Sequence, residues 1–296
     1  MTPTGGDCRF LRAAVLEPMA HTGNRSPVAN LKCDWQPEST VGCGVADVSS
    51  DRADRIMAAI NDLAQAEGTP VSVRHVCQAC ANAMHASGVA LYVIGDLGLG
   101  EPVHATGPVS ERVAELQVTL GEGPAMQALA EVRAVAVPDL SSLPAQRDWP
   151  VFAAQVWAMG IRATFVYPLA IGAITVGTLE IHRIATGGLS AAERTDALLY
   201  AEVAMHLILD RVHDVPTLSE RELFASEFGV RWAVVHQATG MVSMQLRADL
   251  ITAFLRLRAH AFSTGRRLSE VADDVVDRKL WFAPDSTGET GPPTDR

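Results

Sequence analysis

Basic side chains are concentrated near the C-terminal end of the chain. Between Gly229 and Phe282 eight basic residues stand against five acidic ones, so this segment carries +3 and the remaining residues carry −13 of the formal net charge of −10. Arginine guanidinium groups present planar sets of donors that match phosphate oxygens. The segment therefore suits an anionic partner, whereas the acidic remainder argues against nonspecific polyanion binding by the whole molecule. The same distribution is also typical of a solvated helical bundle.

A glycine in this segment raises a second question. The stretch VVHQATGMVSMQL (234–246) has helical spacing, yet a glycine inside a helix costs about 1 kcal/mol relative to alanine. Ala238 and Gly240 leave a strip of main chain with little side-chain cover. Two interpretations are open: the strip packs tightly against neighbouring helices, or it offers bare backbone to a partner.

Three amphipathic helices are expected to position these residues. A capping box of Ser219 and Glu222 predicts the start of the first helix. The second is predicted over 249–262 and the third over 269–279, each with apolar residues at spacings of three, four and seven. Joined by short loops, they predict an all-α three-helix bundle over 217–283, small enough to gain from docking on a partner or on the preceding helix.

An α+β unit is predicted ahead of this bundle. Residues 1–52 are rich in Gly, Pro, Ser, Thr and Asn and predict a flexible tail, and a second tail is expected over 284–296. Over 53–214, helices bracket strands that are expected to pair antiparallel. The predicted elements are helices 51–66 and 70–86, strands 88–94 and 103–106, helices 108–117 and 125–131, strand 134–137, helix 148–163, strands 164–171 and 175–183, and a last helix that opens with a Ser190–Glu193 capping box and ends before Pro216.

The order of these elements resembles a GAF domain. The resemblance covers about 53–212 and depends on LGEGP (120–124) before a short helix, a VAVPDL strand (135–140), and a VGTLEIHR strand (176–183) before the closing helix. It implies an antiparallel sheet flanked by helices, in a fold that usually holds small ligands or makes dimers.

The C-terminal segment closely resembles the ANTAR domain, an RNA-binding module of bacterial transcription antitermination regulators that is often found behind a GAF domain in actinobacteria. The match covers about 221–282 and depends on VVHQATGMVSMQL and on AFLRLRAHAFSTGRRLSEVADDVVDRKLWF (253–282). The residues that match the family's small-residue step, second-helix core, and loop and third-helix signature are Ala238, Gly240, Ala253, Leu257, Arg266, Arg267, Leu268, Val271 and Ala272.

The resemblance implies RNA hairpins as the partner. A hairpin loop exposes unstacked bases and phosphates, which require guanidinium groups, hydrogen-bonding side chains and close backbone access. The candidate RNA-binding residues are His236, Gln237, Thr239, Gly240, Arg256, Arg258, His260, Arg266 and Arg267. With so few cations one module binds modestly, so a homodimer that grips paired hairpins is expected.

The function predicted from these features is a transcription antitermination regulator. The GAF-like unit senses an unknown signal or dimerises, and the three-helix unit controls terminator formation. Two alternatives stay open: a GAF-containing DNA-binding regulator, and a non-catalytic dimerisation or sensor protein. Against DNA binding, the third helix is expected to expose Glu270, Asp273, Asp274 and Asp277, which would repel phosphates.

The sequence contains few features that would support an enzyme, a metal site or a membrane protein. Only two lysines, Lys32 and Lys279, are available, and the chain has no nucleophile elbow or phosphate-cradling loop, so neither catalysis nor a cofactor is expected. Cys77 and Cys80 lie one helical turn apart and are expected to be core residues, with no metal site. The sequence shows no secretory signal and no membrane span, so the protein is expected to be cytoplasmic.

A small-molecule pocket in the GAF-like unit is a further expectation. The candidate pocket residues are Trp149, Trp157, Phe165, Tyr167 and His182, although aromatic side chains in such positions are usually core.

Overall fold

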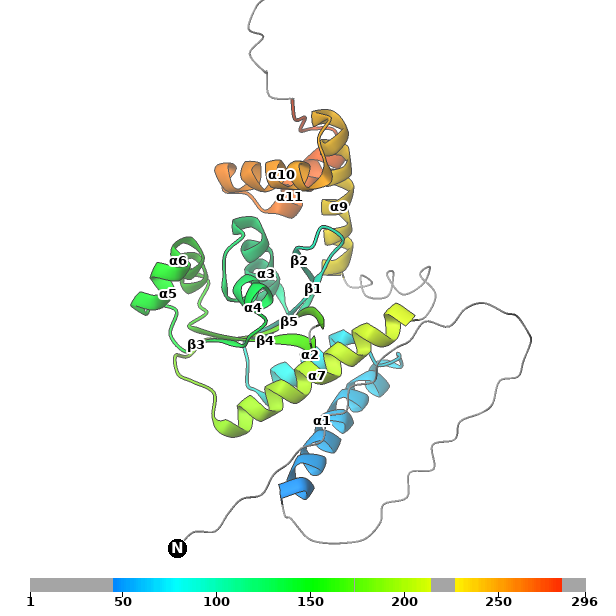
Figure 1. The fold of residues 1–296 in the computed structure, drawn as a ribbon, viewed down its shortest axis with the longest axis vertical. Coiled ribbons are helices and arrows are strands. Elements are labelled where there is room, and N and C mark those ends of the chain that lie inside the picture. The colour runs from blue at the N-terminus through cyan, green and yellow to red at the C-terminus, as the bar shows by residue number, and fades with distance from the viewer. Residues whose placement is uncertain (1–44, 173, 214–226, 284–296) are drawn as a thin grey trace, which may run out of the picture. The chain divides into compact units, whose positions relative to one another are not determined.

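The computed structural model describes residues 45–172, 174–213 and 227–283 (Figure 1). All of them belong to one compact unit that begins at Gly44. We call residues 45–213 the sheet unit and residues 227–283 the three-helix unit. None of the described helices is long and apolar enough to cross a membrane.

Five antiparallel strands form the centre of the sheet unit. They are β1 (Gly88–Ile94), β2 (Gly100–Ala105), β3 (Val135–Val137), β4 (Ala163–Ile171) and β5 (Ile174–Arg183), in the spatial order β2-β1-β5-β4-β3. Every neighbouring pair is antiparallel. The predicted α+β class, with an antiparallel sheet between helices and helical segments after it, is confirmed.

Helices cover both faces of the sheet. Because successive strand residues point to opposite faces, Leu91, Phe165 and Ile181 enter one core and Ala90, Tyr92 and Val166 the other. The first core lies against α1 (Val45–Glu67), α2 (Val73–Ala83) and α7 (Ala191–His213). The second lies against α3 (Pro108–Leu120), α4 (Pro124–Glu131), α5 (Leu143–Asp148) and α6 (Pro150–Ala158).

Two predicted boundaries are corrected by the structure. Helix α1 already begins at Val45, inside the segment 1–52 that was predicted to be a tail, while residues 1–44 lie outside the described residues. The single helix predicted over 148–163 is instead the pair α5 and α6. They separate at Trp149, whose φ of −140° and ψ of 70° lie outside the helical region, because a residue before proline is disfavoured in that region.

A capping box fixes the start of α7, as predicted. The Glu193 backbone amide donates to Ser190 Oγ at 3.2 Å, and the Ser190 amide donates to Glu193 Oε2 at 2.7 Å. The corresponding Ser219–Glu222 box and the predicted tail over 284–296 lie outside the described residues.

The three-helix unit consists of α9 (Glu227–Leu246), α10 (Leu250–Thr264) and α11 (Leu268–Val276). Asp249 caps α10, because its Oδ1 accepts the Thr252 amide at 2.8 Å. Gly265 ends that helix in the left-handed conformation, with φ of +65°. The three helices form a common core whose fully buried side chains include Ala238, Val242, Ala253, Leu257, Leu268, Val271 and Ala272. Val118 of α3 belongs to the same cluster, so the three-helix unit packs on the sheet unit.

Replacement of Leu257 by alanine tests this packing. Because Leu257 is fully buried at the centre of the cluster, we expect Leu257→Ala to lower the free energy of unfolding by about 2–5 kcal/mol. Leu255→Ala is the matched control, since Leu255 lies on the same helix but is 49% exposed. Urea unfolding followed by circular dichroism measures both, and equal effects of the two substitutions would contradict the assigned core.

Candidate nucleic-acid interface

Gly240 lies in α9 beside open space. A Cβ atom added at this position would meet no heavy atom within 4 Å, whereas Ala238 two residues earlier is fully buried. Close packing inside the three-helix unit therefore explains Ala238 but not Gly240. The interpretation of Gly240 as an internal packing glycine is therefore wrong. A glycine inside a helix lowers the stability of that helix, and packing among the described residues does not offset this loss at Gly240.

The residues around Gly240 divide between an open and a buried face of α9. Gln237 is exposed and Met244 is 80% exposed, and both lie on the face that Gly240 shares. Thr239 was predicted to face RNA but is buried, and its Oγ1 donates to the Val235 carbonyl at 2.7 Å. The prediction that Thr239 faces RNA is therefore wrong: its hydroxyl group donates a hydrogen bond within its own helix, as threonine often does inside helices.

His236 lies at the edge of this open face and pairs with the sheet unit. Its Nε2 lies 2.9 Å from Oε2 of Glu101, a buried residue on β2. The hydrogen bond to Glu101 raises the pKa of His236. Five residues before His236 on the same helix, Arg231 forms an ion pair with Glu111 of α3.

Glu115 of α3 binds the start of α11. This glutamate is 3% exposed, and its Oε2 accepts from Arg267 Nε at 2.7 Å while its Oε1 accepts the Ser269 amide at 2.7 Å. The first amides of a helix have no partner within the helix and carry partial positive charge. Glu115 thus neutralises both a guanidinium group and a helix N-terminus.

Arg258 of α10 lies against the C-terminal end of α3. Its Nε donates to the Thr119 carbonyl at 3.3 Å, which is one of the carbonyls that a helix end leaves without an internal partner. The guanidinium group rests on Gly121, where a Cβ atom would overlap it. Burial lowers the pKa of Arg258, as expected for a cation removed from water.

For the remaining candidates, Arg266, His260 and Arg256, the contacts described lie within the three-helix unit. Arg266 Nη1 donates to Asp274 Oδ2 at 2.7 Å, and its Nε lies 3.9 Å from Glu270 Oε2. His260 packs its ring edge-on against Phe282, with 5.5 Å between ring centroids, and Arg256 is half-buried. Of the nine predicted residues, Gln237 and Gly240 are open, Thr239 is buried, and His236, Arg258 and Arg267 contact the sheet unit.

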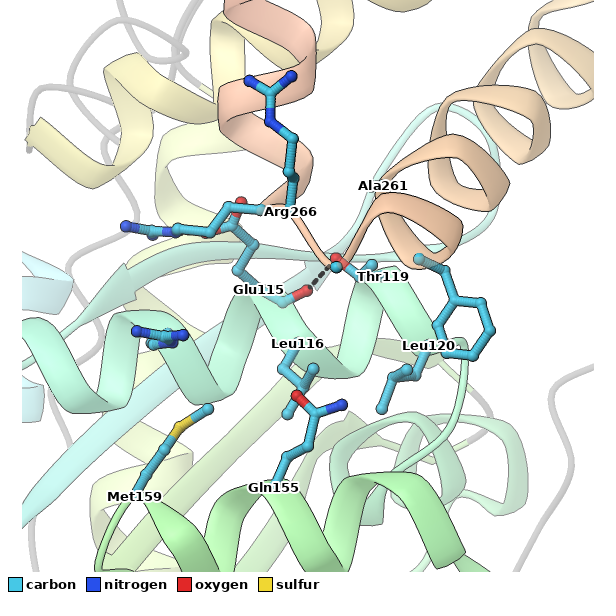
Figure 2. Close-up of a pocket in the computed structure, with 12 residues that line it drawn as sticks. Glu115, Leu116, Thr119, Leu120, Gln155, Met159, Ala261 and Arg266 are labelled. Carbon is cyan, nitrogen blue, oxygen red and sulfur yellow. Dashed lines mark hydrogen bonds and ion pairs between the residues drawn. The ribbon is translucent and has the colours of Figure 1, made fainter.

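A cleft lies where α3 and α6 meet the turn between α10 and α11 (Figure 2). It has a volume of about 120 Å³. Figure 2 shows Glu115 pointing toward the turn, with Leu116, Leu120 and Met159 on the apolar side. Arg266 and Arg267 also line the cleft. Any molecule that occupies this space would touch both units.

A buried polar cluster holds the opposite side of α3 to the sheet. Glu180 on β5 is fully buried and accepts from Tyr92 Oη at 2.8 Å, Gln117 Nε2 at 2.6 Å and Thr164 Oγ1 at 2.9 Å. His182 Nε2 lies 3.3 Å from Glu180 Oε2, without hydrogen-bond geometry.

These contacts set the protonation of Glu180. Burial alone would raise the pKa of this carboxyl group, but the His182 imidazole and the hydrogen bonds from Tyr92 and Thr164 outweigh it and lower the pKa below its ordinary value. Burial, together with the neighbouring Glu180, raises the pKa of the Tyr92 hydroxyl. A charged carboxylate in the interior requires this full set of donors.

The predicted pocket residues do not line one cavity. Phe165 and Tyr167 belong to the core on one face of the sheet, while Trp149 and Trp157 belong to the core on the other. His182 is fully buried, with Nδ1 3.0 Å from Ser110 Oγ. Strand alternation places Phe165 and Tyr167 on the same side of β4. Trp149 and Trp157 belong instead to the α5–α6 region, which packs on the other face. The prediction of one pocket lined by these five residues is therefore wrong.

Sequence reasoning missed the acidic partners on the sheet unit. Glu111 and Glu115 are one helical turn apart on α3, and Glu101 is on the neighbouring β2. Within a single helix this spacing signals only a shared face. In the folded protein this face of α3 contacts Arg231 and Arg267, which lie more than 100 residues later in the chain. Tertiary packing creates these contacts, and no local sequence pattern indicates them.

The cysteines that the structure describes are core residues. Cys77 and Cys80 are fully buried in α2, and burial raises the pKa of Cys77 to about 12. Within residues 45–172, 174–213 and 227–283, no group of three or more His, Cys, Asp or Glu side chains is placed to hold a metal ion.

Comparison with known proteins yields only distant structural likenesses. No family model matches the chain, and no curated protein matches it. Among solved structures, the GAF domain of a phosphoenolpyruvate-protein phosphotransferase from Acinetobacter is similar, with 14% identity, 56% of this chain and 95% of that chain covered, and a TM-score of 0.41. The corresponding GAF domain from Coxiella burnetii gives 16% identity, 54% and 96% coverage, and a TM-score of 0.43. With TM-scores below 0.5, these likenesses carry no inference about what this chain binds.

Substitution of Glu180 tests the buried cluster. We expect Glu180→Gln to lower the free energy of unfolding by about 3 kcal/mol at neutral pH, because it leaves His182 without its charged partner. The folded pKa of Glu180 is lowered, so its contribution is present above the ordinary carboxyl pKa and is lost as pH falls through the lowered value. The variant should therefore lose less stability than wild type on acidification.

Urea unfolding at pH 7 and at several values below pH 5 measures this difference. Glu202→Gln is the matched control, because Glu202 is an exposed residue on α7. Parallel pH profiles for wild type and Glu180→Gln would show that Glu180 is not charged in the folded protein.

Proposed function

We propose that the protein is an RNA-binding regulator of transcription termination. In this proposal the three-helix unit binds paired RNA hairpins in the manner that its resemblance to the ANTAR domain implies. The sheet unit, which resembles a GAF domain in its order of elements, receives a signal or supports a homodimer. The protein then acts by binding rather than by catalysis.

The observation that carries the proposal is the open backbone at Gly240. A mid-helix glycine that no neighbour crowds destabilises its helix without any benefit to internal packing. Close approach of a ligand to the main chain gives this position a purpose, since a side chain there would hold the ligand away. Gln237, exposed on the same face, supplies a hydrogen-bonding side chain beside the open backbone.

The arrangement of the family-like residues supports the same proposal. Ala253, Leu257, Leu268, Val271 and Ala272, which match the ANTAR signature, are all fully buried in the common core of the three helices. These residues therefore act as packing positions, and Arg266 and Arg267 follow directly after the left-handed Gly265 at the turn into α11.

A protein-binding role is the second candidate, and one observation favours it. Helix α10 exposes Ile251, Leu255 and Phe262, each about half exposed, at spacings of four and seven residues. Apolar residues at this spacing form one helix face, which is typical of a helix-to-helix contact. A second copy of the chain or another helical protein would then bind here without any nucleic acid.

Recognition of duplex DNA has less support. The helix that would enter the major groove in a helix-turn-helix protein needs basic and polar residues on its open face. On α11 the exposed side chains include Glu270, Asp273 and Asp277, and Asp274 pairs with Arg266.

The Gly240→Ala substitution separates partner binding from packing. We expect this variant to be more stable than wild type by about 1 kcal/mol, because alanine favours the helix and meets no neighbour. We expect it also to bind a paired-hairpin RNA about tenfold more weakly in an electrophoretic shift assay, since the added methyl group obstructs the backbone.

Gly188→Ala is the matched control, because Gly188 also has open space around it but lies outside the three-helix unit. Its RNA affinity should equal that of wild type. Duplex DNA at several salt concentrations tests nucleic-acid selectivity in the same assay. Unchanged RNA binding by Gly240→Ala, or no RNA binding by wild type, would contradict the proposed function.

A further inference from the structure

Contacts between the two units use the cationic groups of the three-helix unit. Glu101, Glu111 and Glu115 of the sheet unit pair with His236, Arg231 and Arg267, respectively. In a fourth contact Arg258 donates to a carbonyl oxygen, that of Thr119. Every one of these links places an oxygen acceptor of the sheet unit on a basic group of the three-helix unit.

The acceptors resemble the groups that a nucleic acid would present. A phosphate binds guanidinium groups and helix N-termini through charge-assisted hydrogen bonds from two or more donors. Glu115 satisfies this description, because its two oxygens bind the Arg267 guanidinium and the Ser269 amide at the start of α11. It occupies the donors that a phosphate oxygen would otherwise use.

The two arrangements exclude each other on steric grounds as well. The Glu115 side chain is 3% exposed, and Arg258 rests directly on Gly121. The apolar part of the contact includes Val118 of α3 in the same cluster as Trp232 and Phe254. While α3 lies on them, RNA cannot bind the donors of Arg258 and Arg267 that Thr119 and Glu115 already occupy.

We propose that RNA and helix α3 compete for one cationic face of the three-helix unit, made up of Arg231, His236, Arg258 and Arg267. The carboxylates of Glu101, Glu111 and Glu115 act as an internal substitute for RNA phosphates and hold the protein in a closed state. RNA binds the open state, so its apparent affinity is reduced by the fraction of molecules that are open. This inference rests on the proposed function and adds the surface involved and its competitor.

Neutralising the carboxylates tests the competition in the full chain. Glu115→Gln keeps the shape of the side chain but removes its charge, and Glu111→Gln does the same one turn earlier. We expect the double variant to bind a paired-hairpin RNA at least about tenfold more tightly than wild type, because the open fraction rises. Adding Arg267→Gln should reverse much of this gain, since it removes a group that RNA would use.

The control for net charge is the variant Glu131→Gln/Glu202→Gln, which removes two carboxylates elsewhere on the sheet unit. We expect its RNA affinity to stay within about twofold of wild type at the same salt concentration. Circular dichroism verifies that each variant is folded.

The outcomes separate this inference from the proposed function. If wild type binds RNA and neutralising Glu111 and Glu115 leaves the affinity unchanged or weakens it, the competition is overturned while the proposed function stands. The same holds if the charge control gains as much affinity as the Glu111/Glu115 variant. If neither wild type nor the double variant binds RNA, the proposed function fails and this inference fails with it.

Discussion

The buried carboxylate of Glu115 is the interaction on which the relation between the two units depends. An ionised group that is 3% exposed requires charge-assisted partners, and its partners, Arg267 and the Ser269 amide, both come from the three-helix unit. Separation of the units would return Glu115 and Arg267 to water, where each regains hydration. The pair therefore contributes less to net stability than its distances suggest, because desolvation offsets attraction. Such a contact specifies one docked geometry while remaining open to competition from another anion.

Helix α3 connects this contact to the interior of the sheet unit. Ser110 and Gln117 on its inner side hydrogen bond within the buried cluster around Glu180 and His182, while Glu111 and Glu115 on its outer side bind the three-helix unit. A helix is rigid over one or two turns, so a change in the buried cluster that shifts α3 would shift its outer carboxylates too. The sheet unit thus has a physical route by which a signal in its interior would alter the availability of Arg267. Figure 1 shows α3 between the sheet and the pair α10 and α11, in agreement with these contacts.

The sequence predicts the secondary-structure elements better than the tertiary contacts between them. Strand-forming residues between turns predict the five strands, helical spacing of apolar residues predicts the three C-terminal helices, and the Ser190–Glu193 capping box predicts the start of α7. Local signals failed at Trp149, where a proline divides one expected helix into two. They also failed for Thr239, whose hydroxyl bonds its own helix, and for the five aromatic and histidine candidates, which the sheet separates onto its faces. The pairing of Glu115 with Arg267 spans 152 residues, and nothing in the local pattern of either segment indicates it.

Hydrogen exchange of helix α3 during RNA binding measures whether RNA displaces this helix from the three-helix unit. In the free protein the three-helix unit covers Glu115, Val118 and Thr119, so the amides of the second half of α3 should exchange slowly. We expect saturating hairpin RNA to speed their exchange, because RNA takes the cationic face and uncovers α3. Exchange in α3 that stays unchanged or slows when RNA is bound would contradict this expectation.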